Sequence, residues 1–161
     1  MSLHENTQIM MVDGSKKKIS DVCIGDIVKT DDAHVKIINI FRGWEESLVE
    51  IKTIDGISIQ LTEDHMVMVD DGWKEASELK VGDILQKDDK IVSIGDVPGC
   101  EVYDIEADSD GTGIYANDIV VGDFSMNNSF KMSTKTYLKK NTGSNNDMLT
   151  EMIKTLEDLN R

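Results

Sequence analysis

The chain has 161 residues, of which 39% are hydrophobic, and carries a formal net charge of −14. This length predicts one domain with room for an appendage, and the acidic charge argues against general nucleic-acid binding. No apolar run reaches the roughly 20 residues of a membrane helix, and the N-terminus lacks a secretory signal. Two cysteines, Cys23 and Cys100, make no disulfide framework. We expect both thiols to be buried. We expect a cytoplasmic protein, or part of a virion assembled in the cytoplasm, that is not secreted. We expect it to bind neither nucleic acid nor a membrane.

Three segments predict closely spaced strands. TQIMMVDGSKKKIS (7–20) carries a central Asp13-Gly14 turn, and SLVEIKTIDGISIQLT (47–62) alternates around Asp55-Gly56. Asp-Gly predicts a hairpin because glycine tolerates the positive φ that a tight turn needs. VYDIEADSDGTGIYANDIVVGDF (102–124) indicates a strand, a polar loop and further strands. Together they predict an all-β domain.

An internal repeat supports this prediction. ISDVCIGDIVKTDD (19–32) aligns with ASELKVGDILQKDD (76–89) at an offset of 57 residues. We expect Gly25 and Gly82 to supply the turn conformation, and Asp26 and Asp83 to bind local amides. The repeat indicates two β-subdomains related by pseudo-two-fold symmetry, although two ordinary turns would explain the same pattern.

The charge pattern changes near residue 125. Residues 1–125 hold 11 Lys/Arg and 27 Asp/Glu, whereas residues 126–161 hold 6 and 4. We expect a β domain over 1–125, a polar basic linker or arm over 126–145 and an amphipathic helix over 146–161. One isolated helix is marginal in water, so we expect this helix to dock on its own domain, on a second copy or on a partner.

Four segments in order resemble the Hint domain, the fold that inteins share with hedgehog autoprocessing domains. The first is residues 7–28, and the second is residues 61–85, which contain Thr-x-x-His. VYDIE (102–106) and IYANDIVV (114–121) are similar to the final block. The resemblance covers about residues 2–124 and implies a horseshoe of two pseudo-symmetric β-subdomains, with the C-terminal arm and short α-helix appended.

The resemblance also implies roles for particular residues. Ser2 falls at the position of the nucleophile that attacks the preceding peptide bond. Thr62 and His65 fall where that family polarises the carbonyl and protonates the leaving amine. Asp104 falls where the family often has an acid for proton transfer. Read without the resemblance, Thr62 and His65 would be an ordinary strand end and a histidine that orients a turn.

Three positions depart from the intein pattern. Serine is a weaker nucleophile than cysteine, and only Met1 precedes Ser2 in the sequence as given. At the other end, Gly122 takes the place of the usual histidine and Asp123 the place of the terminal asparagine whose amide cyclises. We therefore expect no full splicing, and at most an acyl shift or cleavage at the N-terminal junction.

Two functions remain open from the sequence. The first is an autoprocessing Hint domain that acts in cis on a flanking polypeptide, without cofactor or metal. The second is a catalytically inactive structural or assembly module of a multi-subunit complex, for example a viral particle, which binds a partner or itself through residues 126–161. The acids of EADSDGTG (106–113) resemble half of a calcium loop but lack its terminal acid, so a hairpin loop is the better interpretation.

Overall fold

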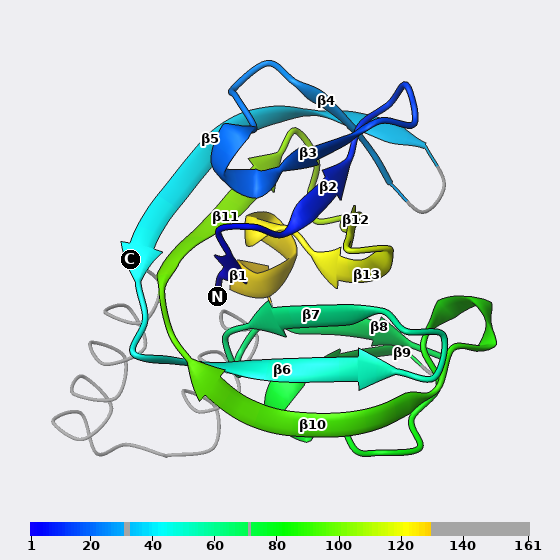
Figure 1. The fold of residues 1–161 in the computed structure, drawn as a ribbon. Coiled ribbons are helices and arrows are strands. Elements are labelled where there is room, and N and C mark those ends of the chain that lie inside the picture. Colours follow the sequence, from blue (N-terminus) through cyan, green and yellow to red (C-terminus); the bar gives the residue numbers. More distant parts are fainter. Residues whose placement is uncertain (31–32, 71, 130–161) are drawn as a thin grey trace, which may run out of the picture.

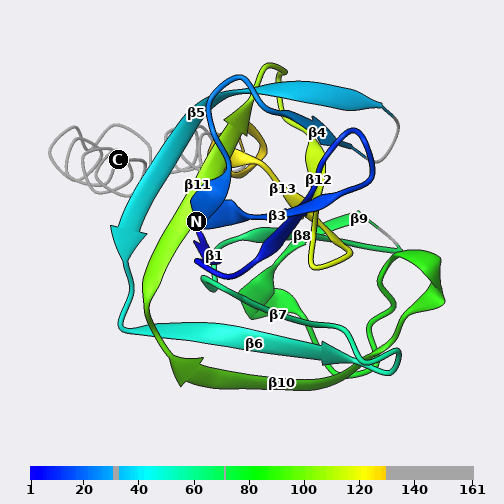
Figure 2. The same ribbon diagram turned by 45° about the horizontal axis from the view of Figure 1, so that its top comes forward.

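The structure, a computed structural model, describes residues 1–30, 33–70 and 72–129 and contains two curled antiparallel sheets (Figures 1 and 2). The first has seven strands in the order β10 (Ile91–Pro98), β6 (Ser47–Thr53), β7 (Ser58–Leu61), β1 (Leu3–His4), β11 (Glu101–Ala107), β5 (His34–Trp44) and β4 (Ile27–Lys29). The second has six strands in the order β3 (Lys16–Lys18), β2 (Gln8–Met10), β12 (Gly113–Ala116), β13 (Ile119–Gly122), β8 (Met66–Val69) and β9 (Gly72–Glu75). The predicted all-β architecture is confirmed.

Short helical segments complete the fold. Three 3₁₀ turns span Ile19–Asp21, Ala76–Glu78 and Gln86–Asp88. Residues 124–129 are α-helical, and they follow β13 directly. No helix in the described part of the chain is long and apolar enough to cross a membrane.

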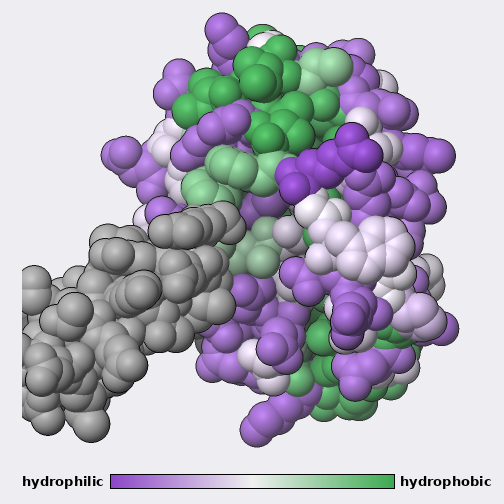
Figure 3. Space-filling model, turned by 90° about the vertical axis from the view of Figure 1, so that its left-hand side faces the viewer, coloured by the Kyte–Doolittle hydropathy of each residue, from purple (hydrophilic) through white to green (hydrophobic). Residues whose placement is uncertain are grey.

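The hydrophobic core lies between the two sheets. Branched side chains such as Ile51 and Ile105 in one sheet and Ile9 and Val121 in the other are fully buried in a single cluster. The strands differ in exposure: β6 has exposed and half-buried residues between its buried ones, whereas all four residues of β13 are buried. Figure 3 shows mainly hydrophilic residues on one face, with apolar areas near its top and bottom.

The internal repeat is a structural repeat. The 3₁₀ turns that begin at Ile19 and Ala76 are each followed by a glycine in the left-handed region, Gly25 at φ 95° and Gly82 at φ 100°. The next residue, Asp26 or Asp83, accepts a hydrogen bond from the amide three residues earlier, at 2.9 Å in both copies. The expected turn glycines and amide-binding aspartates are therefore confirmed.

Two expectations need revision. Cys23 is exposed and Cys100 is half-buried, because both lie in turns at the ends of strands rather than inside the core. The segment expected to be a linker from 126 begins as helix, since Asp123 caps a helix that runs through 129. The rest of that linker and the helix expected over 146–161 lie outside the described residues.

Replacing a turn glycine tests the repeat. Gly25→Ala should lower the free energy of unfolding by about 1–2 kcal/mol, because a side chain disfavours the left-handed conformation. Gly95→Ala is the matched control, since Gly95 has no positive φ and nothing lies within 4 Å of an added Cβ. Urea unfolding of both variants measures the difference, and equal stabilities would contradict the prediction.

Candidate active site

The N-terminal residues pair with the loop that follows β7. The Ser2 amide donates to Thr62 Oγ1 at 2.8 Å, and the Thr62 amide donates to the Ser2 carbonyl at 2.9 Å. The neighbouring register pair Leu3–Leu61 continues this pairing into the sheet. Thr62 therefore holds the nitrogen of the Met1–Ser2 peptide bond, the bond that a nucleophile at Ser2 would attack.

His65 lies three residues further, fully buried. Its Nε2 is 2.9 Å from the Gly122 carbonyl oxygen, which only accepts hydrogen bonds, so Nε2 carries the proton. Nδ1 is then a bare acceptor, and it has no hydrogen-bond partner among the described residues. Burial lowers the pKa of His65 to about 3, and the Met1 ammonium acts in the same direction. The imidazole is therefore neutral at pH 7.

Asp104 is buried on β11 and is 1% exposed. Its Oδ1 accepts the Ile105 amide at 2.9 Å, and its Oδ2 has no hydrogen-bond partner in the described structure. Burial raises the pKa of Asp104 well above its ordinary value, while the Met1 ammonium and the Asn127 amide act in the opposite direction. A raised pKa favours a neutral carboxylic acid, which is a proton donor.

Asn127, on the helix after β13, contacts several parts of this site. It is 1% exposed, and its Oδ1 accepts the Met66 amide at 3.1 Å. Its Nδ2 lies 3.3 Å from the Gly122 carbonyl oxygen and 3.5 Å from His65 Nε2. Because its amide also influences the Asp104 carboxyl, Asn127 connects β8, β13 and β11 around the imidazole.

Asp123 has a different environment from the other predicted site residues. Its Oδ1 accepts the Thr112 amide at 3.2 Å and the Met126 amide at 2.9 Å, and its Oδ2 accepts the Ala107 amide at 2.9 Å. The bond to Met126 is the N-cap interaction that begins the helix at 124. Burial raises the pKa of Asp123 in spite of these donors. The carboxyl is thus held by backbone amides.

The structure brings the predicted residues of the N-terminal step together. Thr62 binds the Ser2 amide, His65 lies on the following turn, and the Met1 ammonium influences the pKa values of both His65 and Asp104. The set contains the Thr62 hydroxyl in contact with this peptide bond, a buried imidazole whose pKa is lowered and a buried carboxyl whose pKa is raised. Such a set can move a proton between the Ser2 hydroxyl and the Ser2 nitrogen.

Sequence reasoning missed two residues of this site. Asn127 lies in a stretch that was interpreted as linker; the signal that indicates a helix there is Asp123, a favoured N-cap residue, directly after a strand. Asp64 Oδ1 forms an ion pair with the Met1 ammonium nitrogen at 2.9 Å. Nothing in the sequence indicates that contact, because it depends on where the N-terminus lies.

Known structures show which class of protein shares this fold. The sequence matches no protein-family model and no curated protein. The gp41-1 intein crystal structure superposes with a TM-score of 0.66 at 28% identity, over 74% of this chain and 96% of that intein. The Ssp DnaB mini-intein variant M86 gives a TM-score of 0.68 at 25% identity, over 76% and 93% of the two chains.

A DnaB intein from Synechocystis sp. is similar to the same extent, with a TM-score of 0.69 at 24% identity, over 76% of this chain and 97% of that one. The aligned part of this chain thus matches nearly the whole of each intein structure. The protein has the intein-like Hint fold that the four sequence segments predicted.

The buried imidazole predicts a pH dependence of stability. The folded pKa of about 3 lies below the ordinary value of 6.5, so the unfolded state binds more protons between these values. The His65 contribution is complete above pH 6.5 and is lost as the pH falls towards 3. Lowering the pH from 7 to 5 should remove about 2 kcal/mol.

The matched comparison is His65→Gln, whose side-chain amide can still donate to Gly122. Asp104 contributes with the opposite sign, because its raised pKa gives stability that is complete below 3.8 and lost as the pH rises. Both proteins retain Asp104, so the difference between their urea-unfolding curves at pH 7 and pH 5 isolates His65. Parallel pH profiles would contradict a buried neutral imidazole.

Removing the Asn127 side chain should destabilise the protein. Asn127→Ala leaves the Met66 amide without its side-chain acceptor in a buried position, which costs about 1–3 kcal/mol. Asn39→Ala is the control, because Asn39 is exposed and its side chain accepts only the neighbouring Ile40 amide among the described contacts. Chemical denaturation of both variants measures the difference, and a neutral Asn127→Ala would show that Asn127 contributes little.

Proposed function

We propose that this intein-like domain acts on its own chain and is limited to the N-terminal half of the autoprocessing reaction. The reaction is an acyl shift of the peptide bond before Ser2 onto the Ser2 hydroxyl, followed by hydrolysis of the resulting ester. The flanking polypeptide in cis is the substrate, and neither cofactor nor metal takes part. The observation that carries the proposal is the Ser2 amide bound to Thr62 Oγ1 one turn from neutral, buried His65.

The described side chains can supply each proton transfer. The Ser2 Oγ attacks the carbonyl carbon of residue 1, and His65 Nδ1 accepts the hydroxyl proton. The carbon–nitrogen bond then breaks and the proton passes to the Ser2 nitrogen, which becomes an amine. Water hydrolyses the ester, so that the upstream segment leaves with a carboxyl group and Ser2 recovers its hydroxyl.

The charge at the N-terminus affects the strength of this base. The Met1 ammonium contributes to the low pKa of His65. In a chain with residues ahead of Met1, that nitrogen belongs to an uncharged amide, so the repulsion is absent and the pKa of His65 is higher. Since proton transfer is faster when the pKa of the base is nearer to the working pH, the reaction is favoured in the extended chain.

The C-terminal half of the reaction has no comparable support. Asp123, which aligns with the cyclising asparagine, has a carboxyl without a nucleophilic amide nitrogen, and it binds three described backbone amides. The chain then continues as helix, with Asn127 packed against the site. We therefore propose cleavage at the N-terminal junction without splicing.

The rival proposal is a catalytically inactive assembly module, cytoplasmic or within a virion, that binds partners through residues 126–161. The observation that favours it is the helix at 124–129, which is joined to the domain by the hydrogen bond of the Met126 amide to Asp123 and by that of the Met66 amide to the buried Asn127 side chain. This function needs no reaction at Ser2. The two proposals therefore differ in whether the peptide bond before Ser2 is cleaved.

A fusion experiment tests the cleavage. A reporter protein is placed ahead of Met1 in the full chain, with Ser2 and with Ser2→Cys, and intact mass is followed with and without a thiol. We expect release with the break before residue 2, at least tenfold faster for Ser2→Cys because a thiolate forms more readily than an alkoxide. His65→Ala should abolish release.

His34→Ala is the control, since His34 is exposed on β5 and should leave the rate unchanged. No release from the Ser2→Cys fusion would overturn the autoprocessing proposal and favour the assembly module. If release persists in His65→Ala, the cleavage proposal stands but His65 is not its base.

A further inference from the structure

The Asn127 side chain enters the site from beyond the position at which the resemblance ends the domain. The resemblance places the last residue of an intein at Asp123, and Asn127 follows four residues later in the helix at 124–129. Its side chain is nevertheless buried, and its Nδ2 lies 3.5 Å from His65 Nε2. A residue far downstream of the Met1–Ser2 bond thus belongs to the surroundings of the imidazole.

Glycine at position 122 makes room for this side chain. A Cβ added to Gly122 would lie 2.9 Å from Asn127 Oδ1 and 2.8 Å from Met126 Cγ, which is closer than ordinary van der Waals contact. The Gly122 carbonyl is also the group that accepts the hydrogen bond from His65 Nε2, at 2.9 Å. The missing side chain therefore lets Asn127 lie against the carbonyl that anchors the imidazole.

The Asn127 amide holds two groups that support His65. Its Oδ1 accepts the amide of Met66, the residue that follows His65, at 3.1 Å. Its Nδ2 lies 3.3 Å from the Gly122 carbonyl oxygen, to which the imidazole is bound. One planar group, with an acceptor at one end and donors at the other, thus fixes both the backbone beside the ring and the acceptor of its proton.

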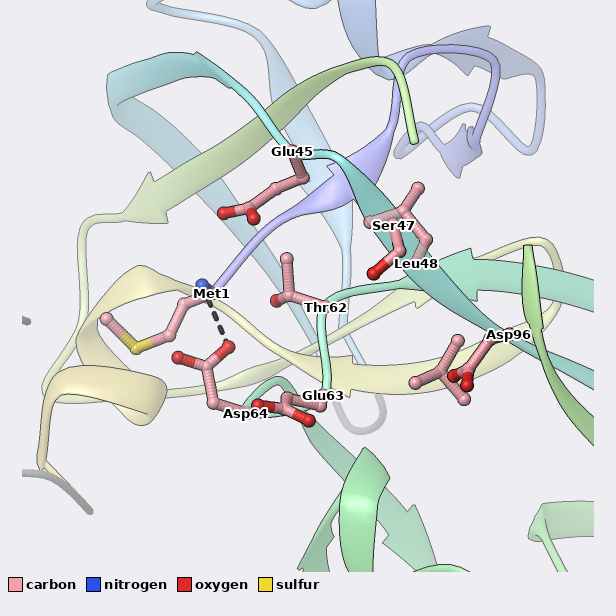
Figure 4. Close-up of a pocket in the computed structure, with 9 residues that line it drawn as sticks. Met1, Glu45, Ser47, Leu48, Thr62, Glu63, Asp64 and Asp96 are labelled. Carbon is pink, nitrogen blue, oxygen red and sulfur yellow. Dashed lines mark ion pairs between the residues drawn. The ribbon is translucent and has the colours of Figure 1, made fainter. Parts of the chain in front are cut away.

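The same contact fixes the end of the loop that holds the Met1–Ser2 bond. At the beginning of this loop Thr62 binds the Ser2 amide, and Figure 4 shows Met1 close to Thr62. At its end the His65 amide donates to the Thr62 carbonyl at 3.1 Å. One short turn therefore places the imidazole relative to the bond, and Asn127 binds the residue with which this turn ends.

We propose that Asn127 is a positioning residue of the N-terminal reaction, which acts through His65 from the chain beyond Asp123. It keeps the imidazole anchored by Nε2, so that Nδ1 remains the base for the Ser2 hydroxyl. The inference rests on the proposed function, because it assigns a further residue to the same reaction. It also makes cleavage at the N-terminal junction depend on the helix at 124–129.

The first test measures the imidazole without relying on cleavage. In full-length chains, nuclear magnetic resonance follows the exchange of the His65 Nε2 proton with water. We expect about tenfold faster exchange in Asn127→Ala, because the Gly122 carbonyl loses the amide that holds it and the site opens more often. Asn128→Ala is the matched control on the same helix, since Asn128 Oδ1 has no hydrogen-bond partner among the described residues.

Gly25→Ala separates positioning from stability. This variant should destabilise the fold by a similar amount, at a turn of the repeat that lies outside the site. We expect it to leave the exchange of the His65 proton close to that of the parent chain. Equal acceleration in Gly25→Ala and Asn127→Ala would show that Asn127 acts on stability alone, and would overturn the proposal.

The second test displaces Asn127 without removing it. In the Ser2→Cys reporter fusion, Gly122→Ala and Asn127→Ala should each slow release about tenfold, because a small misplacement of a catalytic group is costly. In the Asn127→Ala background, Gly122→Ala meets the flexible Met126 side chain but no longer Asn127 Oδ1, so its effect should be much smaller. Gly95→Ala, which has nothing within 4 Å of the added Cβ, should leave the rate unchanged. Fully additive effects of the two substitutions would contradict the assignment.

Failure of this inference and failure of the proposed function give different results. If the parent Ser2→Cys fusion and its Asn127→Ala form are released at the same rate, the cleavage stands and Asn127 is not a positioning residue. If the parent fusion is not released, the cleavage is wrong, and the exchange of the His65 proton decides whether Asn127 holds the imidazole.

Discussion

The two-residue strand β1 is the constraint on which the rest of the structure depends. It pairs with β7 on one side and with β11 on the other, so it joins the two halves of the seven-stranded sheet. Leu3 within it is fully buried. Because Ser2 immediately precedes this strand, the sheet hydrogen bonds that close the fold also fix the Met1–Ser2 bond against Thr62. Folding and the geometry of the site therefore have the same origin.

Burial is the main cause of the shifted pKa values in the site. His65 and Asp104 are both buried, and desolvation is the main cause of the pKa shift of each, downward for the imidazole and upward for the carboxyl. Both groups are thereby favoured in their neutral forms, one as a proton acceptor and one as a donor. The Met1 ammonium lowers both pKa values. Converting it to an amide raises both, so an upstream segment would strengthen the base and keep the acid protonated.

The sequence predicted local features well, because they depend on residues close together in the chain. The Gly25 and Gly82 turns follow from the backbone freedom of glycine and from a repeat visible by inspection. The contact of Thr62 with Ser2 was expected from the resemblance and not from any local pattern. The burial of Asn127 and the contact of Asp64 with Met1 depend on tertiary packing across more than 60 positions, which no local pattern records. Cys23 was wrongly expected to be buried because apolar neighbours do not reveal a turn.

Asp123, at the end of the domain, shows how a carboxylate can organise the chain that follows it. The sequence resemblance implies that Asp123 stands where an intein would have an asparagine whose amide attacks its own carbonyl. A carboxylate lacks that nucleophilic nitrogen but is a strong acceptor, and here it binds the amides of Ala107, Thr112 and Met126. The last of these begins the helix that carries Asn127 into the site. The Asp123 carboxylate thus caps the helix at 124–129, and this helix places Asn127 beside His65.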